Sequence, residues 1–125
     1  MCTMYYTLLM PFGLYIRGLR ECRHSDDRSY SLRQVAQRVS LEPAYLSKIE
    51  REVASPPSEA TIRRIADDLG ENPDLLLAMA GKVSKDLQEI IIRRAPLFAD
   101  LLRNLREAPD HAVLRIVREV RDGDW

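Results

Sequence analysis

Residues 31–50 constrain the fold more than any other stretch, because two helical patterns lie on either side of a very short break. Four apolar residues recur at helical spacing and predict one buried helix face: Leu32, Val35, Ala36 and Val39. Ser31 precedes this face, where its hydroxyl can accept a hydrogen bond from the first turn. The pattern stops at residues 40–42, and Pro43 then supplies the preset φ of a first helical position.

A second helix is predicted from Pro43 to about Val53. Leu46, Ile49 and Val53 form its apolar set and are expected to point into the core. The opposite face mixes small, polar and basic groups: Ala44, Ser47, Lys48 and Arg51, with Tyr45 beside them. Two short helices joined by a three-residue turn form the helix-turn-helix plan, whose second helix enters the major groove of DNA.

Composition favours an all-α, soluble domain with a modest extension. The 125 residues are 46% hydrophobic and 30% charged, with few glycines and without strand-like alternation. Lys+Arg and Asp+Glu are 19 each, so the net charge is zero. Phosphate contacts supply most non-specific DNA affinity, so a DNA-binding chain with this balance needs its cations grouped locally.

The basic residues of the first half are grouped in this way. Eight of them precede residue 52: Arg17, Arg20, Arg23, Arg28, Arg33, Arg38, Lys48 and Arg51. Nearby acidic residues partly cancel them. We therefore expect weak non-specific DNA binding and reliance on dimerisation.

Several function classes are disfavoured by the sequence. Cys2 and Cys22 have no metal-ligand spacing with each other or with His24 and His111, so we expect no metal site and interpret both as reduced thiols. The sequence contains no Gly-rich phosphate loop and no nucleophile arrangement, so we expect neither enzyme activity nor a bound cofactor. Because no apolar run approaches the roughly 20 residues of a membrane span, we expect a cytoplasmic protein without a membrane partner.

Residues 1–12 are apolar but lack the features of a cleaved leader. We interpret them as an N-terminal tail, either disordered or a start-site artefact in which translation begins at Met10. The alternative is an amphipathic arm that packs on a partner.

The chain resembles the XRE family of lambda-repressor-like transcriptional regulators. The resemblance is carried by Ala36, the turn at Ser40-Leu41, Tyr45-Leu46-Ser47 and Ile49-Glu50-Arg51. It implies a five-helix DNA-binding domain over residues 13–81, and a buried pair between Arg23 and Glu50.

Two positions depart from the family pattern. Ser40 stands where the family has a turn glycine, so a positive φ there would be costly. Glu52 replaces the glycine that ends the recognition helix in many members, and we interpret this as a changed helix exit.

The remaining helices of this domain follow from periodicity and capping. Gly13 to Arg23 predicts the first helix, with Leu14, Ile16 and Leu19 near one face. Ser58 begins a helix that Gly70 ends as a C-cap. Asn72-Pro73 starts another helix that runs to Gly81.

The resemblance also implies the DNA contacts, residue by residue. Ala44, Tyr45, Ser47 and Lys48 match positions that touch base edges. Ser31, Arg33 and Arg51 match positions that contact phosphate. Glu42 is interpreted as part of a solvated face.

Residues 82–125 form a predicted helical extension that is more apolar than a short hairpin can bury. Stripes occur at Leu87, Ile90 and Ile91, at residues 97–105, and again after Pro109. We interpret this surplus as a dimer interface. The alternative is an intramolecular cap on the preceding domain.

Two functions from different classes fit these observations. The first is a sequence-specific transcriptional regulator, a repressor that binds an inverted-repeat operator in double-stranded DNA as a homodimer through residues 43–53. The second is an antitoxin-like or adaptor protein. Its C-terminal helices would bind a partner protein, a toxin or a protease, while DNA binding serves autoregulation.

Overall fold

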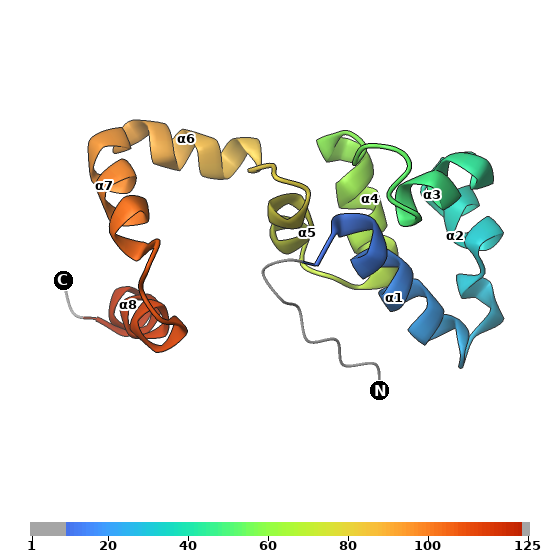
Figure 1. Ribbon diagram of the computed structural model, residues 1–125, viewed down its shortest axis with the longest axis horizontal. Coiled ribbons are helices and arrows are strands. Elements are labelled where there is room, and N and C mark those ends of the chain that lie inside the picture. Colours follow the sequence, from blue (N-terminus) through green and yellow to red (C-terminus); the bar gives the residue numbers. More distant parts are fainter. Residues whose placement is uncertain (1–9, 124–125) are drawn as a thin grey trace. The chain divides into compact units, whose positions relative to one another are not determined.

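The computed structural model describes residues 10–123 and divides the chain into two compact units, Met1–Ser84 and Lys85–Trp125. Eight α-helices and one short 3-10 helix make up the secondary structure of the described residues (Figure 1), which contain no strand. The prediction of an all-α protein is therefore confirmed.

Five helices build the first unit around a single core. They are α1 (Phe12–His24), α2 (Leu32–Arg38), α3 (Pro43–Glu50), α4 (Glu59–Leu69) and α5 (Pro73–Met79), and the 3-10 helix Arg28–Tyr30 lies between α1 and α2. The core takes hydrophobic side chains from every one of the five helices. Phe12 opens α1 and is buried, whereas residues 1–9 of the predicted tail lie outside the described residues.

Local signals begin and end these helices at the expected residues. The Ser31 hydroxyl accepts a hydrogen bond from the Gln34 N–H at 3.3 Å, and Ser58 accepts one from Thr61 at 3.4 Å. Gly70 follows α4 with a φ of 69°, the left-handed conformation that closes a helix. Both N-caps and this C-cap are confirmed as predicted.

The buried faces of α1 and α3 differ from the prediction at two residues. Leu14 is 44% exposed, and Tyr15 is buried beside Ile16 instead. Val53 is 66% exposed because α3 ends at Glu50, so the helical period no longer applies three residues later. The predictions that Leu14 and Val53 belong to the core are wrong.

The charged pair that joins α1 to α3 also differs from the prediction. Arg20 donates from Nε and Nη2 to the two carboxylate oxygens of Glu50, at 2.8 and 2.9 Å, and both residues are buried. Its Nη1 reaches the Tyr30 carbonyl at 3.3 Å. Arg23, nearly one turn further along α1, lies 5.8 Å from the centroid of the Tyr30 ring. The Arg23–Glu50 pair implied by the family resemblance is therefore wrong, since Arg20 occupies the buried side of α1.

Both positions that depart from the family glycines keep a left-handed backbone. Ser40 has a φ of 60° and Glu52 a φ of 61°. The Glu52 carboxylate accepts hydrogen bonds from the N–H groups of Gly13 and Leu14, at 2.6 and 3.2 Å. A Cβ on Gly13 would overlap the Ile49 carbonyl oxygen, so only glycine fits this crossing. Glu52 therefore has a left-handed backbone after α3 and caps the start of α1, and the interpretation of a changed helix exit stays a prediction.

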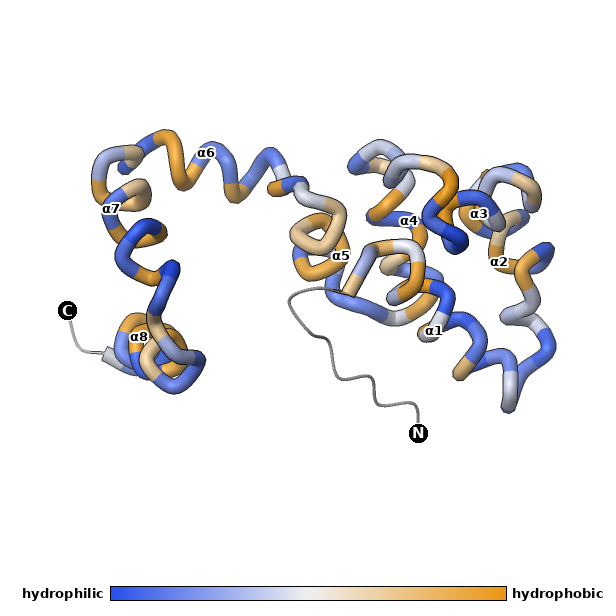
Figure 2. The backbone as a smooth tube through the Cα atoms, in the orientation of Figure 1, coloured by the Kyte–Doolittle hydropathy of each residue, from blue (hydrophilic) through white to orange (hydrophobic). Residues whose placement is uncertain are grey.

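The second unit contains α6 (Lys85–Arg93), α7 (Ala95–Leu105) and α8 (Asp110–Asp122). Figure 2 shows apolar and polar residues interleaved along all three. None of these helices contains a buried residue. Three amphipathic helices thus form where the periodicity predicts them, but without a closed core.

Cys22 lies near the end of α1, whereas Cys2 lies outside the described residues, so the expectation of two reduced thiols stays a prediction.

Candidate nucleic-acid interface

The α2–α3 pair is held by backbone and side-chain contacts on both sides of its turn. The Leu41 N–H donates to the Ala36 carbonyl at 2.8 Å, closing the chain after α2. From α4, the Arg64 Nε donates to the Val39 carbonyl at 3.1 Å and satisfies an acceptor at the end of α2. Leu46 and Ile49 bury the inner side of α3. These contacts fix α3 with its opposite side toward solvent.

The solvent side of α3, with Arg51 immediately after the helix, carries five of the seven residues predicted to contact DNA. Ala44, Tyr45, Lys48 and Arg51 are exposed, and Ser47 is half-buried. The Ser47 hydroxyl accepts a hydrogen bond from the Arg51 Nε at 3.1 Å. This bond holds the Arg51 guanidinium along the last turn of α3, beside the base-reading candidates.

Two further candidates come from the start of α2. Arg33 is exposed and Ser31 is half-buried. Because the Ser31 oxygen accepts the cap hydrogen bond from Gln34, its hydroxyl hydrogen remains a donor. The structure therefore brings donors from α2 and α3 to the solvent side of one helix pair.

Within the part of the chain that the structure describes, ion pairs engage some basic residues of the first unit but none of the interface candidates. Four arginines are paired with carboxylates: Arg17, Arg20, Arg38 and Arg63. Among residues 10–123, Arg33, Lys48 and Arg51 form no ion pair with a carboxylate. A chain with zero net charge thus keeps uncompensated cations on α2 and α3.

Arg38 belongs to the predicted basic cluster but makes contacts within the first unit. Its guanidinium binds the Asp68 carboxylate and the Ser29 carbonyl, and it lies 5.0 Å from the Tyr30 ring centroid. The hydrogen bond that Arg38 donates to Asp68 raises the pKa of Arg38 above its ordinary value. Arg38 therefore joins α2 to α4, although the sequence placed it in the basic cluster.

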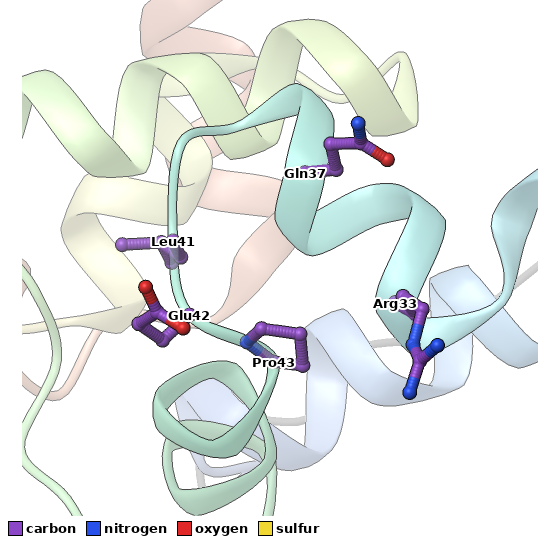
Figure 3. A pocket seen from close by; sticks show the side chains of 5 residues that line it. All are labelled: Arg33, Gln37, Leu41, Glu42 and Pro43. Atoms are coloured by element: carbon purple, nitrogen blue, oxygen red, sulfur yellow. The ribbon is translucent and has the colours of Figure 1, made fainter.

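A shallow hollow of about 350 Å³ lies where α2, the turn and α3 meet (Figure 3). It is lined by Arg33, Gln37, Leu41, Glu42 and Pro43. Gln37 was not among the predicted site residues, although it follows Arg33 by four positions and so shares its face of α2. Glu42 immediately precedes α3 and is exposed.

The comparison with known families matches a helix-turn-helix domain over residues 11–79. This match covers more than half of the chain, and the chain belongs to this family, which is found in XRE-like regulators. The family supports a DNA-binding regulator in general and is typically non-enzymatic. Neither the curated proteins nor the solved structures include a match to this chain.

Between residues 10 and 123, no group of three or more His, Cys, Asp or Glu side chains is placed to hold a metal ion. No helix in that range is both long and apolar enough to span a membrane.

Proposed function

We propose that the protein is a sequence-specific DNA-binding transcriptional regulator that represses by occupying its operator. The observation that carries this proposal is the solvent side of α3, with Lys48 and Arg51 uncompensated and Arg33 beside them on α2. Helix-turn-helix proteins insert this second helix into the major groove. Unpaired cations there can neutralise phosphates without first breaking an internal ion pair.

The candidate residues divide by chemistry into two groups. Ala44, Tyr45, Ser47 and Lys48 are assigned to base edges, where Ala44 can contact a thymine methyl and Lys48 a guanine edge. Phosphate contacts that set the register are assigned to Ser31, Arg33 and Arg51. The hydrogen bond between Ser47 and Arg51 makes these two groups neighbours at the end of α3.

The regulator is proposed to act as a homodimer formed through the second unit. Its exposed apolar residues lie on all three helices: Leu87, Ile90, Ile92, Leu97, Leu101, Leu102, Leu114, Val117 and Val120. From residue 85 onward, basic and acidic residues occur in equal numbers, so two copies meet without net repulsion. A hollow of about 210 Å³ on α7, lined by Arg94, Leu97, Phe98 and Leu101, gives this surface a concave site for an apolar side chain of the second copy.

Selection from a randomised duplex library at moderate salt tests the DNA-binding proposal. An enriched inverted repeat with half-sites about one helical turn apart is the expected result for a dimer. With two cations from each protomer, Arg33 and Arg51, at the phosphates, log K should fall with log salt at a slope of about −4. A folded protein that enriches no motif would contradict the proposal.

A charge placed in the apolar surface tests the dimer. Val117→Glu adds a carboxylate to the apolar side of α8, whereas Arg118→Glu adds one to its polar side as a matched control. Sedimentation should show the Val117 variant as a monomer and the control as a dimer. If both variants sediment like the unchanged protein, the second unit does not form the interface through α8.

The same exposed surface supports a second candidate function, an adaptor or antitoxin-like protein. In that case α6, α7 and α8 would bind a different protein, a toxin or a protease, and DNA binding would serve autoregulation. A neighbouring toxin or metalloprotease gene would favour it. A folded, monomeric protein whose helices gain protection from hydrogen exchange only with that gene's product would establish it.

A further inference from the structure

Glu42 is an anion on a surface proposed to face DNA, and no internal contact of the described residues accounts for it. Although it occupies the N-cap position of α3, its side chain makes no capping hydrogen bond. The Tyr45 and Leu46 N–H groups donate instead to the Glu42 backbone carbonyl, both at 3.0 Å. Within residues 10–123 its carboxylate takes part in neither a hydrogen bond nor an ion pair.

Glu42 lines the same hollow as two residues of α2. Figure 3 shows Glu42 lining the hollow together with Gln37 and Arg33. Pro43 follows it as the first residue of α3 and restricts the Glu42 backbone to the extended conformation that it adopts, with φ −67° and ψ 135°. Arg33 adds a cation to the same hollow, which lowers the repulsion between this region and a phosphate backbone.

The chemistry of base edges limits what a carboxylate at this position can contact. A carboxylate only accepts hydrogen bonds, and a phosphate or the acceptor-only edges of guanine and thymine would repel it. Donors in the major groove are the cytosine N4 and adenine N6 amines. Adenine also presents its N7 lone pair beside the amine, which leaves cytosine as the better partner.

We propose that Glu42 reads a cytosine amine at one base pair of each half-site. This inference rests on the proposed DNA-binding function and adds a position to its recognition surface. Arg33, in the same hollow, contacts the adjoining phosphate and compensates for the negative charge that Glu42 brings to the groove.

Operator selection with three variants of the full chain tests this inference. Wild type should prefer cytosine at one half-site position by about tenfold or more over the other bases. Glu42→Ala should lose that preference alone. Glu42→Gln should move it to adenine, because an amide pairs with adenine N6 and N7. Asp67→Asn, which removes an exposed carboxylate from α4, should leave every position unchanged.

The outcomes separate this inference from the function on which it rests. If wild type enriches a motif and Glu42→Ala and Glu42→Gln enrich the same motif at every position, the cytosine contact is wrong while DNA binding stands. A uniform gain in affinity of Glu42→Ala for all sequences, with an unchanged motif, would also overturn it and would place the carboxylate opposite a phosphate. A wild-type protein that enriches no motif overturns both proposals.

Discussion

The two units of the chain contain similar amphipathic helices, but only the first unit buries residues of its helices in a core. In the first unit, α1 to α5 share a core that includes fully buried Ile62, Leu76 and Leu77. In the second unit, α6, α7 and α8 are as long and as clearly amphipathic, yet they bury no residue. Helix length and periodicity therefore do not decide whether a unit closes its own core. Packing supplies most helical stability in proteins, and the helices of the second unit do not obtain it from a core of their own.

The largest expected effect comes from the buried ion pair of the first unit. Glu50→Ala removes the two carboxylate acceptors of Arg20 and leaves a buried guanidinium without an anionic partner. We expect the free energy of unfolding to fall by about 3–5 kcal/mol, measured by urea denaturation. Glu21→Ala breaks the exposed pair with Arg17 and should leave the unfolding midpoint nearly unchanged. Equal losses for the two variants would contradict the distinction between buried and exposed pairs.

A pair of identical leucine substitutions compares the two units directly. Leu46 is 1% exposed and Leu97 is 71% exposed. Leu46→Ala should cost about 2–5 kcal/mol, since it removes packed methyl groups and leaves a cavity. Leu97→Ala should change the stability of the monomer by no more than about 0.5 kcal/mol and should instead weaken dimerisation. A large loss of monomer stability from Leu97→Ala would mean that the second unit has a core of its own.

Substitutions on α3 test whether DNA contact belongs to the first unit alone. Lys48→Ala should cost about 1–3 kcal/mol of binding at the preferred site and relax specificity at one base pair. Arg51→Ala should weaken binding to all sequences about equally and lower the magnitude of the salt slope by about one per protomer. Fluorescence anisotropy with the selected and a scrambled duplex measures both effects, and sedimentation should show unchanged oligomers. Equal, sequence-independent losses would identify Lys48 as another phosphate contact.

The smallest expected effect comes from the turn between α2 and α3. Ser40 has a φ of 60°, a conformation that costs a residue with a Cβ about 1–2 kcal/mol. Ser40→Gly should therefore stabilise the protein, by up to about 1 kcal/mol after the entropy of the unfolded glycine is offset. Ser40→Ala keeps the strain and should give no such gain. Thermal unfolding at one fixed protein concentration compares the three proteins.

Much of the first unit follows from signals that act within one or two helical turns. The caps at Ser31, Ser58 and Gly70 form where the sequence predicts them, because each hydrogen bond or backbone conformation involves near neighbours. The outward side of α3 was also predictable, since helical spacing separates Lys48 from the buried Leu46 and Ile49. What these exposed residues bind remains a prediction from chemistry and family membership.

The sequence by itself determined the number and amphipathic character of the helices, the helix-turn-helix plan and the family. Only the tertiary structure decided that Arg20, and not Arg23, meets Glu50, that Glu52 caps α1 from the end of α3, and that the second unit buries no residue from α6 to α8. The physical reason is the separation along the sequence of the residues that interact. Helical periodicity and capping depend on residues within about four positions, whereas these contacts join residues separated by 30 positions or more. Which side chains meet across such a sequence separation depends on how whole helices pack. The spacing of neighbouring residues does not determine that packing.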